Sequence, residues 1–203
     1  MKEHGQEENL SSRRRPTLER VQETRHRPRQ RLIRHVRGIN QRRIEEIGLR
    51  EGSSLRKSEV KWLVRLLEIE PKKLVAPASF DLRLKVQKAV FLLHHLKASP
   101  FTDYLFSLYL HGPYCPDLAK DYYGLEKVRA KKVRLDQKHL ETLRWFVSND
   151  ERWLEVASSI ISIKDRYADV TRERIFSTLT LSKPWVSEDV FESVMSDLER
   201  KEL

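Results

Sequence analysis

The chain has 203 residues, with 40 Lys and Arg against 30 Asp and Glu, which gives a net charge of +10. Its hydrophobic share of 39% is enough for the core of a soluble domain, and no apolar run approaches the roughly 20 residues that would span a bilayer. A single cysteine, Cys115, excludes an internal disulfide framework and favours a reducing, cytoplasmic location. The six glycines form neither of the common phosphate-binding patterns. Membrane, collagen-like, disulfide-rich and common nucleotide-binding classes are therefore excluded.

The basic excess lies in the first third of the chain. Residues 1–77 hold 20 Lys and Arg and 11 Asp and Glu, whereas residues 78–203 hold 20 and 19. Between Arg13 and Arg43 there are 12 arginines and no lysine. This change in composition predicts two parts, an Arg-rich arm over residues 1–53, disordered or partly helical, and a single folded domain over residues 54–203.

Three interpretations of the arm stay open. Arginine-rich segments neutralise phosphates and fold on binding RNA, so residues 13–43 are a candidate nucleic-acid-binding segment. Low apolar content with high charge is equally typical of a disordered tail, and a start codon assigned too far upstream would also add a stretch of foreign composition. The candidate nucleic-acid contacts are Arg13, Arg14, Arg15, Arg27, Arg29, Arg31, Arg34, Arg42 and Arg43.

The first elements after the arm are two helices and a strand. Apolar spacing predicts helices over about 55–69 and 81–97, which Pro71 and Pro100 end. The second helix is apolar over most of its circumference after Lys88, so we expect it at the centre of the fold. Residues 104–110 alternate with a period of two, which predicts a short strand.

The second half of the chain continues this mainly helical pattern. Pro116 suits the first position of a helix to about residue 123, with Cys115 as its N-cap and Gly124 as its end. Residues 131–135 are predicted as a second strand that pairs with the first. Four further helices are expected over about 136–147, 151–163, 171–179 and 187–201. The predicted fold is a compact multi-helix domain, mainly α, with one short two-stranded β ribbon and at most an analogy to winged helices.

Signals of catalysis or metal binding are weak in this sequence. Cys115 has His111 four residues earlier, but Pro113 and Pro116 make the stretch a turn, and an inert buried cysteine is the commoner state. His94 and His95 are adjacent on a helix and face about 100° apart, so they are poorly placed to share a metal. The carboxylate pairs Asp117–Asp121 and Asp165–Asp169 read as ordinary exposed helix charges. We therefore expect no enzyme activity, no cofactor and no metal site.

The aromatic side chains of the domain suggest a binding surface instead. Tyr109, Tyr114, Tyr122, Tyr123, Trp145 and Trp153 are many for a small domain, and such residues anchor interfaces. Trp145 and Trp153 lie near helix stripes, which favours packing. Tyr114 and Tyr122 flank the proline turn and are better candidates for an exposed surface.

Two segments resemble a known family. They are Leu84-Lys85-Val86-Gln87-Lys88-Ala89-Val90-Phe91-Leu92-Leu93 and Phe106-Ser107-Leu108-Tyr109-Leu110-His111-Gly112-Pro113-Tyr114-Cys115-Pro116-Asp117-Leu118. Together they are similar to the YwgA-like uncharacterised proteins of archaea and bacteria and, more distantly, to the Panacea family of SocA-like antitoxins. Gln87 and Lys88 match the helix signature of these families, and Gly112, Pro113 and Pro116 match their turn. His111 stands where an aromatic residue is usual, and Cys115 where serine or valine is usual.

The resemblance covers about residues 55–203 and implies a non-enzymatic, antitoxin- or adaptor-like module that binds a protein partner. Independently of it, the turn has a structural explanation, since Gly112 frees the backbone, Pro113 restricts φ and Pro116 starts a helix. The candidate partner-binding residues are Tyr109, His111, Tyr114, Asp117 and Tyr122. The alternative is a nucleic-acid- or ribosome-associated protein that binds through the arm. No membrane partner is expected.

Overall fold

The computed structural model describes residues 56–203, which hold eight α-helices, two short 3-10 helices and one two-stranded antiparallel sheet. The fold is therefore mainly α with a short β ribbon, as predicted. The elements are α2 (Lys57–Leu66), α3 (Pro71–Leu74), α4 (Phe80–His95), η1 (Phe101–Asp103), β1 (Ser107–Tyr109), β2 (Gly112–Tyr114), α5 (Pro116–Tyr122), η2 (Leu125–Lys127), α6 (Gln137–Val147), α7 (Glu151–Arg166), α8 (Arg172–Ser182) and α9 (Glu188–Arg200). The chain divides into the units Met1–Glu51 and Gly52–Leu203, and the predictions made for residues 1–53 lie outside the described part.

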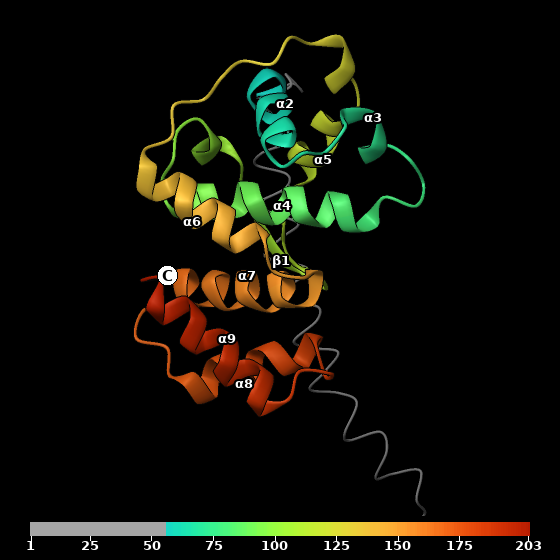
Figure 1. The fold of residues 1–203 in the computed structure, drawn as a ribbon. Coiled ribbons are helices and arrows are strands. Elements are labelled where there is room, and N and C mark those ends of the chain that lie inside the picture. The colour runs from blue at the N-terminus through green and yellow to red at the C-terminus, as the bar shows by residue number, and fades with distance from the viewer. Residues whose placement is uncertain (1–55) are drawn as a thin grey trace, which may run out of the picture. The chain divides into compact units, whose positions relative to one another are not determined.

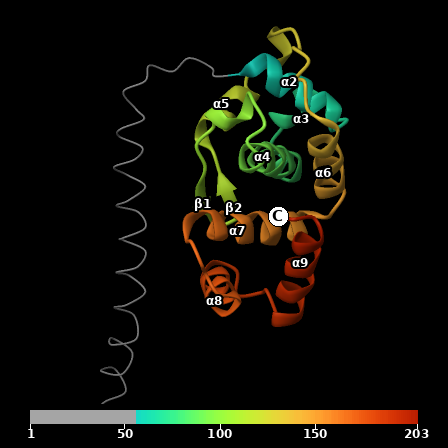
Figure 2. The same ribbon diagram turned by 90° about the vertical axis from the view of Figure 1, so that its left-hand side faces the viewer.

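Helix α4 is central, which confirms the expectation drawn from its apolar circumference. From Val86 to Leu93 every side chain of α4 is buried. Figure 2 views this helix end-on, with α2, α5, α6 and the ribbon around it and α7 beneath it. Because α4 is enclosed by packing partners, its polar residues Gln87 and Lys88 are buried together with its apolar ones.

Helix α7 separates α4 and the ribbon from the last two helices. Figures 1 and 2 show α8 and α9 on the face of α7 opposite to α4. The predicted helix starts are confirmed at Asp136, Thr171 and Ser187, whose side chains accept hydrogen bonds from the main-chain N–H three residues on. Asp150 caps α7 in the same way.

The ribbon differs from its prediction in length and in its second strand. In the observed register Ser107 lies opposite Tyr114, Leu108 opposite Pro113, and Tyr109 opposite Gly112. The chain reverses within two residues because Gly112 takes a left-handed conformation with φ of +83°. Pairing of the first strand with residues 131–135 was wrong.

Residues 131–135 instead run in an extended form beside α2, without forming a strand. The main-chain N–H of Lys131 donates to the Ser58 carbonyl over 2.9 Å. Just before it, the buried Lys61 ammonium donates to the carbonyls of Glu126 (3.2 Å) and Val128 (2.8 Å). The Lys131 N–H is thus satisfied by α2 and not by a strand partner.

Two smaller predictions also need correction. Pro71 ends no long helix but occupies the first turn of the short helix α3, where its missing N–H costs nothing. Helix α2 ends at Leu66, three residues earlier than expected, and the chain leaves it through Glu68, which has a left-handed φ of 59°.

The ribbon does not project from the domain as a wing, because Gly112 and Pro113 are buried against α4 and α7.

Candidate functional site

The proline turn, residues 110–116, is held by close contacts and buried hydrogen bonds. Gly112 lies so close to α4 and α7 that a Cβ atom there would meet Ser159 Oγ at 2.9 Å, Ser158 Oγ at 3.0 Å and Lys88 Nζ at 3.1 Å. Only glycine combines this close approach with the positive φ. Position 112 therefore requires glycine for two independent steric reasons, the close contacts and the positive φ.

Two neighbouring polar residues of α4 hold the edge of β2 that faces α4, away from β1. The Gln87 amide donates to the Cys115 carbonyl over 3.0 Å and accepts from the Cys115 N–H over 3.0 Å. Lys88 Nζ donates to the Pro113 carbonyl over 2.9 Å. The side chains of Gln87 and Lys88 thus take the place that a third strand would have beside β2.

A second buried lysine and a carboxylate hold the tip of the turn. Lys183, which follows α8, is 1% exposed and donates from Nζ to the Leu110 carbonyl over 2.5 Å. The same ammonium lies 3.3 Å from Glu155 Oε1 on α7. Glu155 Oε2 lies 3.0 Å from Nδ1 of His111. Elements far apart in the sequence therefore converge on one turn through charge-assisted contacts.

The buried lysines are electrostatically unusual. Burial lowers the pKa of Lys88 to about 7, and nearby Lys183 lowers it further, whereas Glu155 acts in the opposite direction. Burial also lowers the pKa of Lys183, again against the effect of Glu155. Glu155 is therefore the carboxylate that makes two buried ammonium groups tolerable beneath the turn.

The low pKa of Lys88 predicts that stability rises with pH above neutrality. The folded chain releases this proton near pH 7, whereas an unfolded lysine keeps it to about pH 10. Unfolding therefore takes up a proton in this window, and the free energy of unfolding increases with pH. Between pH 7 and 8.5 we expect a gain of about 1.6 kcal/mol over the change seen in Lys88→Met, measured by urea denaturation. Parallel pH profiles for the two proteins would contradict the assignment.

The structure brings together most, but not all, of the predicted partner-binding residues. Tyr109 is exposed and its ring meets that of Tyr114 edge-on at 5.5 Å. His111 is exposed although its ring contacts Glu155, and Asp117 is partly exposed and paired with Lys120 over 2.9 Å. The expected exposure of Tyr122 was wrong. Its ring is buried and its hydroxyl is 3.4 Å from the Arg83 carbonyl, because α5 turns this side toward α4.

The predicted exposure of Asp121 was also wrong. It was expected to be an ordinary exposed helix charge, but it is buried and accepts a hydrogen bond from the hydroxyl of the buried Tyr104 over 2.7 Å. The spacing of Asp117 and Asp121 puts both on one side of α5, and only the packing decides that Asp121 lies inward. Trp145 and Trp153 are partly buried and stack edge-on at 5.3 Å, which agrees with a packing role.

The cysteine and the two histidines considered for chemistry lie in different surroundings. Cys115 is buried, and burial raises the pKa of its thiol, which disfavours the nucleophilic thiolate. His95 pairs with Asp165 over 3.0 Å, while the ring of His94 lies 5.7 Å from that of Phe106. Within residues 56–203, no three His, Cys, Asp or Glu side chains gather in a way that could hold a metal ion.

The sequence itself indicates that Lys88 is a buried, paired lysine. Lys88 interrupts the apolar circumference of α4, and a charged residue at such a position is expected to be paired. Lys183 and Glu155 carry no comparable local signal, because Lys183 lies outside a helix and Glu155 is one of many charges on an amphipathic helix. Their burial follows from the convergence of α7, α8 and the turn.

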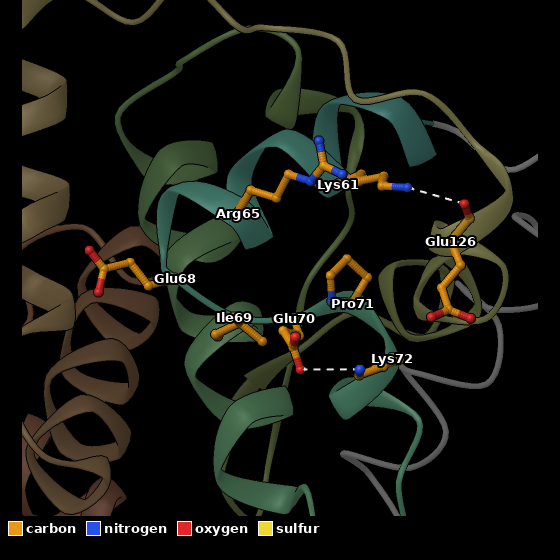
Figure 3. Close-up of a pocket in the computed structure, with 8 residues that line it drawn as sticks. All are labelled: Lys61, Arg65, Glu68, Ile69, Glu70, Pro71, Lys72 and Glu126. Atoms are coloured by element: carbon orange, nitrogen blue, oxygen red, sulfur yellow. Dashed lines mark hydrogen bonds and ion pairs between the residues drawn. The ribbon is translucent and has the colours of Figure 1, made fainter.

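An open groove of about 490 Å³ lies elsewhere, beside α2. It is lined by Lys61, Arg65, Glu68, Ile69, Glu70, Pro71, Lys72 and Glu126. Figure 3 shows the Lys61 ammonium engaged with the main chain of Glu126, and Glu70 beside Lys72. With three cations and three carboxylates the lining favours no particular ligand charge, so the proline turn is the better candidate site.

Comparisons of the chain with protein-family models, with curated proteins and with solved structures found no match. In the described region, each helix is too short or too polar to cross a bilayer.

Proposed function

We propose that the domain is a non-enzymatic protein-interaction module, adaptor- or antitoxin-like, that binds its partner through the outer face of the ribbon and the proline turn. The observation that carries this proposal is an exposed apolar surface on a segment braced from beneath by buried charges. Such a surface on a soluble domain is typical of a protein-binding site.

The surface is formed by side chains that the fold leaves uncovered. Tyr109 is 44% exposed, Leu110 68% and Tyr123 66%. The ring of Tyr109 meets that of Tyr114 edge-on at 5.5 Å. Burial raises the pKa of the Tyr114 hydroxyl, and Cys115, Tyr109 and Tyr123 raise it further. Aromatic side chains gathered in this way supply contact area with little conformational entropy to lose, as interface anchors do.

Rigid support is the second argument for a binding role. Gln87, Lys88 and Lys183 hold the main chain of the turn at Cys115, Pro113 and Leu110. A surface that is already ordered loses less freedom when a partner binds. The resemblance to YwgA-like and SocA-like proteins, which rests on this same turn, supports a protein partner.

The proposal predicts that one substitution on the ribbon abolishes partner binding. Tagged full-length protein is recovered from cells that naturally express it, and a stoichiometric protein partner is expected with the wild type. Tyr109→Arg should reduce its recovery at least about tenfold, since charge placed in an interface core is costly. The matched control is Tyr167→Arg, which changes another exposed tyrosine (53% against 44% for Tyr109) just beyond the C-terminal end of α7. Equal loss in both variants, or in neither, would contradict binding at the ribbon.

The alternative function is nucleic-acid binding through residues 13–43, and it is favoured by the 12 arginines of that stretch. The same recovery experiment separates the two functions. Material that disappears after nuclease treatment and falls steeply between 50 and roughly 200 mM salt would favour the arm. Material that survives nuclease and depends on Tyr109 would favour the domain.

A further inference from the structure

The two edges of the β ribbon differ in whether their outward main-chain groups have hydrogen-bond partners. Pro113 has no N–H, so Leu108 and Pro113 form the non-hydrogen-bonded pair of the ribbon, and the main-chain groups of both point outward. On the β2 side the outward groups are satisfied, by Lys88 at Pro113 and by Gln87 at Cys115. Figure 2 shows β1 as the outer strand, with β2 between it and α4.

The outward N–H and C=O of Leu108 have no hydrogen-bond partner among the residues that the structure describes. Open pairs of this kind at a sheet edge are templates for another strand. The residues beside Leu108 are not protected by charge. Leu105 is 48% exposed, and Tyr109 is also exposed. Every second side chain of an extended chain lies on the same face, so Leu105 and Tyr109, four residues apart, share one.

We infer that the free edge of β1 binds an extended peptide segment of a protein partner, which adds as a third strand and places apolar side chains at alternate positions beside Leu105 and Tyr109. This inference rests on the proposed function and names its mode of binding. In strand addition the main-chain hydrogen bonds contribute affinity, and the alternate side chains contribute specificity.

A flexible peptide fits this edge better than a second copy of the chain. Strand β1 has three residues and is about 10 Å long. Two rigid ribbons paired edge to edge over that length would bury far less than the roughly 800 Å² per partner of a stable interface. A peptide can pair with Leu108 and continue over the exposed Leu110, two residues further along the chain.

Amide hydrogen exchange in the full-length protein tests the edge directly. In the free protein the Leu108 amide should exchange close to its intrinsic rate, whereas the Tyr109 and Tyr114 amides, which pair within the ribbon, should be protected at least about tenfold. A linear peptide selected from a phage-displayed library of random 12-residue peptides serves as the probe. Its binding should slow exchange at Leu108 at least about tenfold. Protection of Leu108 in the free protein, or no change on peptide binding, would overturn the inference.

A pair of substitutions at one position isolates the main-chain contribution. Leu108→Ala and Leu108→Pro both remove the side chain, but only proline removes the N–H. We expect Leu108→Pro to bind the peptide about fivefold to tenfold more weakly than Leu108→Ala. Because proline could disturb the ribbon, the complementary measurement uses wild-type protein and peptides N-methylated at single alternate amides, one of which should lose binding. Equal affinities throughout would refute strand addition.

The outcomes separate this inference from the proposed function. If Tyr109→Arg loses the natural partner while Leu108→Pro keeps it at the level of Leu108→Ala, the ribbon binds a partner by its side chains and strand addition fails. If neither substitution affects the partner, the proposed surface itself is wrong. Binding of a second copy would show as a dimer in sedimentation and would also overturn the peptide assignment.

Discussion

Substituting Glu155 by Gln is expected to lower the free energy of unfolding by about 3 kcal/mol. The carboxylate lies 3.3 Å from the buried Lys183 ammonium and 3.0 Å from Nδ1 of His111, and it opposes the burial penalty of Lys88. Its neutral replacement keeps the shape but leaves buried cations without their counter-ion, a change that typically costs several kcal/mol. Urea denaturation at pH 7 measures the loss.

Glu192→Gln is the matched control, because Glu192 also pairs with a cation, Arg172, but on an exposed surface. It should have little effect, since exposed ion pairs contribute little to stability. Adding Lys183→Met to Glu155→Gln should recover part of the loss, because it removes one uncompensated charge. A loss below about 1 kcal/mol in Glu155→Gln would show that the cluster does not depend on this carboxylate.

Gly112→Ala is expected to lower the free energy of unfolding by about 3 kcal/mol. Part of the loss is the left-handed conformation, which costs a residue with a Cβ about 1–2 kcal/mol. The remainder comes from the collision of that Cβ with Ser158, Ser159 and Lys88, which cannot easily move apart in a packed interior.

Gly124→Ala separates these two causes. Gly124 has a similarly positive φ of +92°, but a Cβ there would meet only the Lys57 ammonium, at 3.8 Å. We expect it to cost about 1 kcal/mol, the conformational part alone. Equal losses at the two glycines would mean that the close approach of the turn to α4 and α7 is relieved without strain.

Helices and their ends were predictable because their causes are local. Apolar spacing and the capping side chains at Asp136, Thr171 and Ser187 act within one or two turns of the chain. Pro116 at the first position of α5 and Gly124 after its end follow the same logic. The helical class and the central position of α4 therefore followed from patterns of neighbouring residues.

The strand pairing was not predictable in this way. Residues 131–135 have a strand-like composition, yet the partner of β1 is the adjacent segment Gly112–Tyr114. That segment contains a glycine and a proline, which local propensity counts against a strand. It forms one because Gln87 and Lys88 supply the hydrogen bonds that a third strand would have made.

The direction in which polar and aromatic side chains face was likewise decided by packing. Tyr122 and Asp121 are adjacent to exposed residues and differ from them only in lying on the inward side of α5. Helix α5 is short and carries charges and tyrosines on several sides, so its sequence does not show which side faces inward. The partners that decide this, Tyr104 for Asp121 and Arg83 for Tyr122, lie well before α5 in the chain.

By itself the sequence determined a helical domain with a proline turn, an uneven charge distribution and an Arg-rich first part, because each of these is a property of composition or of residues within a few positions. Only the tertiary structure decided that Lys88, Glu155 and Lys183 meet beneath the turn, since they come from α4, α7 and the segment after α8. Burial of charge is favourable only where partners converge from distant parts of the chain, and such convergence has no signature in any single stretch of sequence.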